Sequence, residues 1–303
     1  MSTHPLSSDP AQNKNVSILS AGLLLRILAG GIAAAIILTA FGLLTSSGHG
    51  AAFLLQKIIV NLVSGLLYVA VMAPLAISLP LRWPARFGAI FVPLYVTGVL
   101  ADLVEAYFYT TTLTPFKLVM ALIFESIPFL LIALVIAWLL PPSSKARSRP
   151  GLRQRALLSW LWRIVLVGIL YVPTYYLFAT LVTPIEHIFY HDPSFVAQLH
   201  TQVPPASVTI ILEAFRGVFF ALAMLPVLAV MDGPSWPLLL YLTLIGVVIE
   251  AWVPLLGQAN WPWAMRLGNM LELTGDALGR GIAITLLLAL PATFKRRKET
   301  EAG

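Results

Sequence analysis

The sequence contains no cysteine, and only 11% of its 303 residues are charged. The absence of cysteine excludes disulfides, a thiolate nucleophile and any metal or iron–sulfur site built on cysteine. Soluble globular domains carry about 25% charged residues, and disordered chains carry little apolar sequence. Hydrophobic residues make up 59% of this chain and its mean hydropathy is +0.88, so it belongs to neither class. The composition indicates an integral membrane protein.

Long apolar stretches recur along the whole chain. A bilayer core about 30 Å thick is crossed by a helix of about 20 apolar residues, and a spanning segment satisfies its own backbone hydrogen bonds as a helix. Stretches of this kind cover residues 20–44, 53–80, 87–109, 115–140, 157–183, 207–231, 236–256 and 262–292. We therefore predict an all-α, polytopic membrane protein with eight transmembrane helices. The first stretch follows a polar tail (1–19) and is too long for a signal-peptide core, so we expect the mature protein to keep it.

Lysine and arginine are absent from one set of connections between these stretches, namely 45–52, 110–114, 184–206 and 257–261. The other set holds most of the 19 Lys and Arg, above all in the linker 141–156 and the C-terminal tail 293–303. Positive charge is retained on the cytoplasmic side of the cell membrane, so we expect both termini in the cytoplasm and the basic segments against anionic lipid. A nucleic-acid partner is not expected, because the basic runs are short and lack interleaved aromatic residues.

An internal repeat divides the chain into two halves, residues 20–140 and 157–292. The matches occur in the same order in both halves, at offsets of 137 to 153 residues. They include Gly31 with Gly168, Gly65 with Gly217, Asp102 with Glu250, and Glu125 with Glu272. Because each half would hold four spans, the halves share one orientation, related by a pseudo-two-fold axis along the membrane normal.

Ionisable residues inside the spans are costly and mark functional sites by default. Glu125 and Glu272 each lie about 15 Å below the external end of their span at 1.5 Å per residue, which places one acid from each half near the bilayer midplane. We predict proton or cation sites there. The remaining binding or coupling candidates share polar helix faces that would line a cavity open to the outside; they are Asn61, Asp102, Glu105, Glu213, Arg216, Glu250, Arg266, Asn269, Asp276 and Arg280.

Two pairs among these candidates are spaced so that each could form an ion pair within one helix. Glu213 with Arg216 and Asp276 with Arg280 are three and four residues apart, so each pair could simply lock neighbouring helices. Seven such acids nevertheless face five bases, and at least two acids lack a basic partner. An unpaired acid either lies in water or carries a proton, and either state suits a solute pathway. Arg216, Arg266 and Arg280 are candidates for binding an anionic group or for tuning the acids.

His187 and His191 are weak candidates for a metal site on the external side, with Glu186 and Asp192 nearby. Pro193 argues against one rigid helix there, and solvated loop residues are the simpler interpretation. Phosphate-cradling glycine motifs are missing, so the chain is not expected to be an ATP-driven pump by itself. No cofactor is expected.

Residues Leu212–Gly217 resemble the Glu-Glu-x-x-x-Arg-Gly motif of the CAAX-protease and bacteriocin-processing family, whose members use acids and histidines within membrane helices. Here a single glutamate, Glu213, precedes Arg216 by three residues instead of four, and the expected spans contain no histidine. Without histidine the spans offer no evident base or metal ligand to activate water, and we assign no catalytic residue.

Three functions remain open. The leading hypothesis is a secondary transporter or permease for a small molecule or ion, with a polar vestibule open to the extracytoplasmic side. The alternatives are an intramembrane or outward-facing enzyme using an acid pair and loop histidines, and a non-catalytic membrane assembly or sensory subunit. An enclosed polar cavity favours the transporter, whereas a polar stripe facing lipid favours the subunit, with a second copy or another membrane protein as partner.

Overall fold

The computed structural model describes residues 21–45, 51–143, 155–231, 235–258 and 261–289. The predicted polar tail (1–19), most of the basic linker (141–156) and the basic C-terminal tail (293–303) lie outside these residues. Within them, regular structure is helical apart from one isolated bridge between Thr110 and Thr201. The predicted all-α class is confirmed, and in this part of the chain seven helices are long and apolar enough to cross a membrane.

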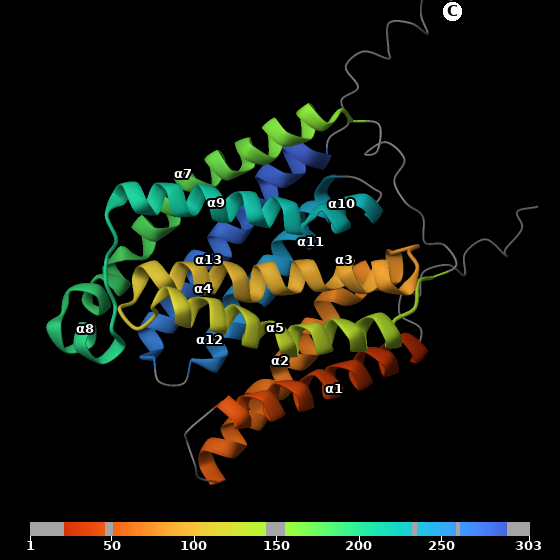
Figure 1. Cartoon of the computed structure of the whole chain (residues 1–303), viewed down its shortest axis with the longest axis horizontal. Helices are drawn as coiled ribbons and strands as arrows, with labels where there is room; N and C mark the ends of the chain where they lie inside the picture. Colours follow the sequence, from red (N-terminus) through yellow and green to blue (C-terminus); the bar gives the residue numbers. More distant parts are fainter. Residues whose placement is uncertain (1–20, 46–50, 144–154, 232–234, 259–260, 290–303) are drawn as a thin grey trace, which may run out of the picture.

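The helices run in alternating directions along one long axis (Figure 1). Those of the first half are α1 (Ala21–Thr45), α2 (Ala51–Ser78), α3 (Trp83–Tyr95), η2 (Val96–Leu100), α4 (Ala101–Tyr109) and α5 (Pro115–Leu139). Those of the second half are α7 (Leu157–His191), α8 (Pro193–Leu199), α9 (Ala206–Ala223), α10 (Leu225–Val230), α11 (Ser235–Gly246), η3 (Val247–Trp252), α12 (Val253–Gly257), α13 (Trp263–Ile284) and η4 (Thr285–Ala289). The π-helical segments η2, η3 and η4 continue the α-helices before them without a break.

Many large apolar side chains are exposed, whereas several charged side chains are buried. Leu25, Ile36 and Leu181 are 66%, 64% and 65% exposed, whereas Glu213 and Arg216 are almost fully buried. An apolar surface of this extent has to be covered by lipid or protein. The arrangement fits the multi-pass membrane protein that the composition indicates.

The segment α13 with η4 is helical from Trp263 to Ala289 but is not one of the seven apolar helices. It carries Arg266, Glu272, Asp276 and Arg280, and several of these side chains are buried against the rest of the bundle. Its composition therefore does not mark it as a span, although it lies alongside α7 and α11.

Helix α7 is longer than the sequence predicts. We expected the fifth span to end at residue 183 and a loop to follow, but the helix continues through Pro184 to His191. A membrane helix tolerates such a proline when neighbouring groups re-satisfy the freed backbone. Glu186, His187 and His191 consequently project from a helix, and the prediction that they belong to a loop is wrong.

Capping residues account for several helix ends. The Thr114 side chain accepts a hydrogen bond from the Lys117 backbone N–H at 3.3 Å, and Pro115 occupies the first turn of α5. Asp192 caps α8 by accepting hydrogen bonds from the Ser194 hydroxyl and backbone N–H, which hold the pKa of Asp192 below its ordinary value.

Contacts at the two ends of the bundle show which helix ends lie together. At one end the Ser143 N–H donates to Ile77 O at 2.8 Å, and Arg86 donates to Ala137 O. At the other end the Thr111 N–H donates to His200 O at 2.9 Å. The basic residues Arg82, Arg86, Arg155 and Arg163 gather at the first end, which we call the basic end.

The helices of residues 21–139 and those of residues 157–289 make a similar set of contacts. Helix α1 packs on α2 and α5, and α3 packs on α5; likewise α7 packs on α9 and α13, and α11 packs on α13. The halves meet where η2 lies against η3, with Gly98 on Ile249, and where the Tyr241 hydroxyl donates to Val71 O at 2.9 Å. An apolar core around Met72, Ile136 and Leu228 fills the basic end.

Candidate functional site

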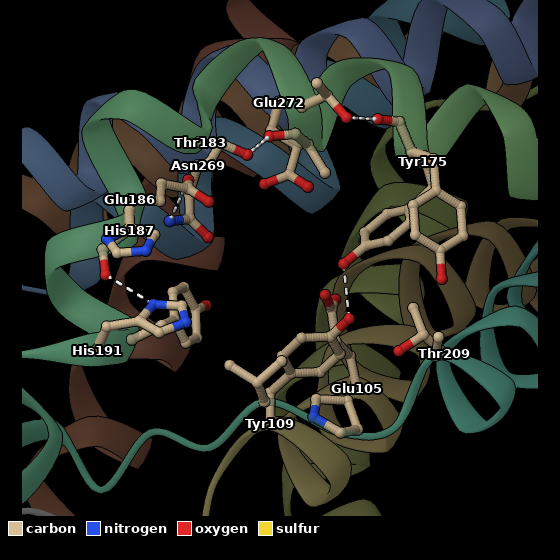
Figure 2. A pocket seen from close by; sticks show the side chains of 17 residues that line it. Glu105, Tyr109, Tyr175, Thr183, Glu186, His187, His191, Thr209, Asn269 and Glu272 are labelled. Carbon is tan, nitrogen blue, oxygen red and sulfur yellow. Dashed lines mark hydrogen bonds between the residues drawn. The ribbon is translucent and has the colours of Figure 1, made fainter.

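A cavity of about 450 Å³ lies toward the end of the bundle opposite the basic end. Figure 2 shows the side chains that line it. Its walls come from α4, α7, α9 and α13, and from the segment that leads into α9. The polar side chains that line it are Glu105, Tyr109, Tyr175, Tyr176, Thr180, Thr183, Glu186, His187, Tyr190, His191, Thr209, Asn269 and Glu272. We call this space the acidic cavity, because three carboxyl groups and no Lys or Arg side chain line it within the described chain.

Two buried acids form one wall of the acidic cavity. Glu186 and Glu272 are 9% and 8% exposed, and they lie close together, because Glu186 bonds Asn269, one turn before Glu272 on α13. Asn269 Nδ2 donates to Glu186 Oε1 at 2.9 Å, but no Lys or Arg of the described residues pairs with either acid. Two carboxylates this close repel each other unless they share a proton or attract a cation.

Tyrosine side chains line much of the rest of the cavity. The hydroxyl groups of Tyr109 and Tyr175 are 2.6 Å apart, and the Tyr109 ring packs edge-on against Tyr190 with centroids 6.4 Å apart. Tyr176 packs edge-on against Tyr175 at 5.4 Å. The cavity therefore combines tyrosine rings with carboxyl groups.

His187 and His191 lie at the rim of the acidic cavity, where both are exposed. Their rings stack with centroids 4.0 Å apart, and His191 Nδ1 donates to the His187 carbonyl oxygen at 3.0 Å. No group of three or more His, Asp or Glu in the described part of the chain is arranged to hold a metal ion. The two histidines stack on each other and His191 bonds to the backbone, so they form part of the cavity rim.

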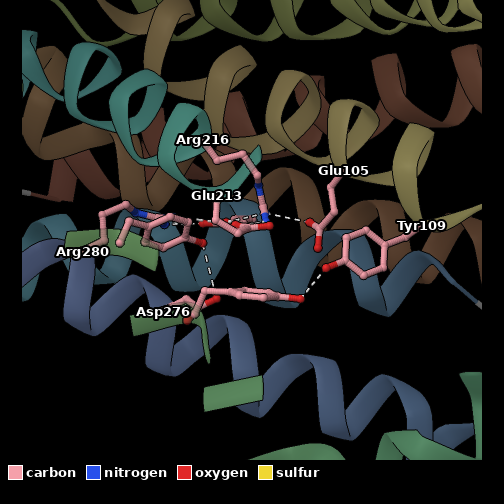
Figure 3. A network of polar contacts seen from close by, with 9 residues as sticks. Glu105, Tyr109, Glu213, Arg216, Asp276 and Arg280 are labelled. Carbon is pink, nitrogen blue, oxygen red and sulfur yellow. Dashed lines mark hydrogen bonds and ion pairs between the residues drawn. The ribbon is translucent and has the colours of Figure 1, made fainter. Parts of the chain in front are cut away.

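Below the acidic cavity lies a buried network of charged side chains (Figure 3). Glu105 connects the two, because it lines the cavity and its Oε2 is 2.7 Å from Arg216 Nη2. Arg216 also lies 2.8 Å from Glu213 Oε2 and 3.5 Å from Glu250 Oε1. The Arg216 guanidinium thus forms ion pairs with three carboxylates, one each from α4, α9 and η3.

The second guanidinium of this network pairs across helices. Arg280 donates from Nη1 to Glu250 Oε1 at 3.2 Å and from Nη2 to Glu250 Oε2. Its guanidinium carbon also lies 3.6 Å from the centroid of the Phe220 ring. The predicted pair of Asp276 with Arg280 does not form, because Glu250 occupies both guanidinium nitrogens; Asp276 Oδ2 instead accepts from the Tyr171 hydroxyl at 3.4 Å.

Negative groups outnumber positive ones in this region. Glu105, Glu213 and Glu250 share two guanidinium groups, Asp276 lies beside them without an ion pair, and Glu186 and Glu272 lie just above. Glu213 Oε1 and Asp276 Oδ1 are buried without a hydrogen bond. Uncompensated buried carboxylates are costly, so this region is suited to hold protons or a cation and unsuited to an anion.

The structure brings Glu105, Glu213, Arg216, Glu250, Asp276 and Arg280 into the network, and Asn269 and Glu272 into the cavity above it. Asn61, Asp102 and Glu125 lie elsewhere, in a cavity of about 340 Å³ that Ser64 and Tyr68 also line. Glu125 and Glu272 thus line different cavities, and residues from before and after the linker 141–156 contribute to each. Arg266 lines neither and packs over the Trp263 ring at 5.0 Å.

Several lining residues were not sequence candidates. Tyr175, Tyr190 and the buried acid Glu186 lie on one face of α7, but that face is recognisable only when the helix continues through Pro184. Tyr171 was overlooked because an aromatic residue within an apolar stretch is usually a packing residue. The spacing of Tyr175, Thr183, Glu186 and Tyr190 is the signal that could have revealed this wall.

Neither a protein family, nor a curated protein, nor a solved structure matches this chain. Its function has to be argued from the site.

Proposed function

We propose that this protein is a secondary transporter or permease of eight spans, built from two repeated four-helix halves, with the acidic cavity open to the extracytoplasmic side. The observation that carries the proposal is a cavity lined by buried acids that continues, through Glu105, into a charged network. Intramembrane carboxyl groups that gain and lose protons are a common means of coupling solute movement to a proton gradient.

Matched helix crossings support the repeat. Gly31 and Gly65 let α1 and α2 approach so closely that a Cβ on Gly65 would lie 2.5 Å from Gly31 O. Gly168 and Gly217, at the matching positions, do the same for α7 and α9: a Cβ on Gly217 would lie 2.8 Å from Gly168 Cα. Small residues at both crossings are what close packing of membrane helices requires.

The two cavities also occupy corresponding places. Glu272 lines one cavity and Glu125 lines the other. In the proposed repeat, the helices that line the first cavity are equivalent to helices that line the second. The network residues Glu213, Arg216 and Glu250 correspond to Asn61, Ser64 and Asp102, respectively. In this proposal the second half carries the charged network, and the matching positions of the first half hold mostly neutral polar side chains.

The distribution of charge supports the orientation. Arg82, Arg86, Arg155 and Arg163 lie at the basic end, opposite the acidic cavity. With the basic end in the cytoplasm, both termini of this cell-membrane protein lie there too, and the acidic cavity faces outward.

The two alternatives have less support. The assembly or sensory subunit predicts polar residues facing lipid, but Glu213, Arg216 and Glu250 are buried within the described part of one chain. The enzyme predicts a histidine within hydrogen-bonding reach of an acid, but in the described residues His191 bonds to a backbone carbonyl and neither histidine contacts a carboxyl group.

A flux measurement tests the proposal. The full-length protein is reconstituted into liposomes that contain a pH-sensitive dye, and solutes are screened under an inward proton gradient. We expect one class of solute to accelerate proton entry, and Glu272→Gln to abolish the acceleration because it removes the titrating group. Glu125→Gln is the matched change in the other half. If both substitutions together leave uptake and proton flux unchanged, the proposal fails.

A further inference from the structure

The acidic cavity has the chemistry of a binding site for an organic cation. It has negative groups and aromatic faces, and its volume of about 450 Å³ lies within the range of small-molecule pockets. Ammonium groups are recognised by aromatic ring faces together with carboxylates. Tyr109, Tyr175, Tyr176 and Tyr190 supply four rings around one space.

The groups that could bind an anion are not free. Arg216 contacts three carboxylates, and Arg280 donates to both oxygens of Glu250. Neither arginine lines the cavity. An anionic solute would therefore meet acids with no guanidinium to offset them.

One acid in the cavity lacks a positive partner. Glu272 is 92% buried and lines the cavity beside a second acid, Glu186, and its carboxyl group forms no ion pair within the described residues. A metal ion is not the natural occupant, since no three-ligand cluster exists in the described chain. A cation that is bulky, apolar in part and able to face a tyrosine ring fits both walls.

We propose that the acidic cavity binds an organic ammonium ion, with the charged group at Glu272 and Glu186 and the apolar part against Tyr175 and Tyr176. Binding such a cation would displace a proton from the acid pair. The claim that such a cation is transported rests on the proposed function. The claim that it binds does not, because binding can be measured without transport.

Calorimetry on the purified full-length protein tests the site. The protein is placed in nanodiscs of phosphatidylglycerol and titrated with benzyltrimethylammonium; benzyl alcohol and benzoate are the neutral and anionic comparisons, and empty nanodiscs give the background. We expect the cation alone to bind saturably. Glu272→Gln should weaken its affinity about ten-fold or more, as expected for loss of about 1.4 kcal/mol of interaction.

A pair of substitutions at one tyrosine separates ring recognition from general damage. Tyr176→Phe keeps the aromatic face and should bind within about two-fold of the unmodified protein, whereas Tyr176→Leu should lose about five-fold. Asp192→Asn makes the same carboxylate-to-amide change outside the cavity and should leave affinity unchanged. If Glu272→Gln does not yield folded protein, the tyrosine pair decides alone.

Ammonium groups also occur in lipid headgroups, so a competition experiment distinguishes a lipid headgroup from a free cation as the ligand. Phosphatidylethanolamine added to the nanodiscs displaces the probe if headgroups share the site, and leaves it bound if the site takes only free cations. Equal binding of benzoate or benzyl alcohol, or equal losses in Glu272→Gln and Asp192→Asn, would overturn the inference.

The two proposals fail separately. Cation binding without any solute-dependent flux would reject transport and keep the site. Proton-coupled uptake of a neutral or anionic solute that needs Glu272, without cation binding, would reject the cation site and keep transport.

Discussion

At the scale of single residues, the network depends on Glu250, the only carboxylate of the described chain that contacts both guanidinium groups. It is almost fully buried on η3, between Arg216 of α9 and Arg280 of α13. A buried charge left without its partner destabilises a fold far more than the intact pair stabilises it. The contribution of Glu250 to stability can therefore be measured by neutralising this side chain alone.

We expect Glu250→Gln to lower the free energy of unfolding by about 3–5 kcal/mol, because two buried guanidinium groups lose their shared acid. Unfolding by titration with sodium dodecyl sulfate measures this. Asp102→Asn is the matched control: Asp102 corresponds to Glu250 in the proposed repeat but is half-buried and forms no ion pair within the described chain. Its loss should stay below about 1 kcal/mol. Similar losses in the two variants would mean that the network contributes little to stability.

At the scale of elements, the helix pairs are held at close distance by glycines. The crossing of α1 and α2 leaves no room for a side chain on Gly65, where a Cβ would meet the backbone of both Gly31 and Ala35. Backbone atoms cannot swing aside as side chains do, so the helices have to separate. Contact between them is lost along the crossing when they do.

We expect Gly65→Ala to lower the free energy of unfolding by about 1–3 kcal/mol, from overpacking at this crossing. Gly88→Ala on α3 is the control, because a Cβ there meets nothing within 4 Å. Alanine favours the helix over glycine by up to about 1 kcal/mol, so Gly88→Ala should be neutral or stabilising. The same detergent titration compares them; a neutral Gly65→Ala would show that α1 and α2 do not pack this closely.

At the scale of the whole molecule, the proposed orientation places Ala85 and Thr111 on opposite sides of the membrane. Both are exposed, Ala85 at the basic end and Thr111 between α4 and α5. Because the natural sequence has no cysteine, a single introduced thiol is the only one that a reagent can meet. The orientation can therefore be measured on an otherwise unmodified chain.

We expect a membrane-impermeant maleimide to label Thr111→Cys in intact cells, and Ala85→Cys only after the membrane is opened. The reason is that basic connections stay in the cytoplasm. Opened cells in which both variants react provide the control for thiol accessibility. The reverse pattern in intact cells would invert the topology, and the acidic cavity would then open to the cytoplasm.

The sequence by itself determined that the chain is helical and apolar enough for a membrane, because spanning length and hydropathy are local properties. The same holds for the faces on which Glu213, Arg216, Asp276 and Arg280 lie, since a period of 3.6 residues fixes positions within one helix. Which acid binds which arginine was decided by the tertiary structure: Glu250 reaches Arg280 from another helix and leaves Asp276 to Tyr171. The aromatic and acidic walls of the acidic cavity likewise follow from the continuation of α7 through Pro184 and from its packing on α9 and α13. Contacts between helices depend on how each rotates and tilts against its neighbours, and no spacing along the chain encodes that by itself.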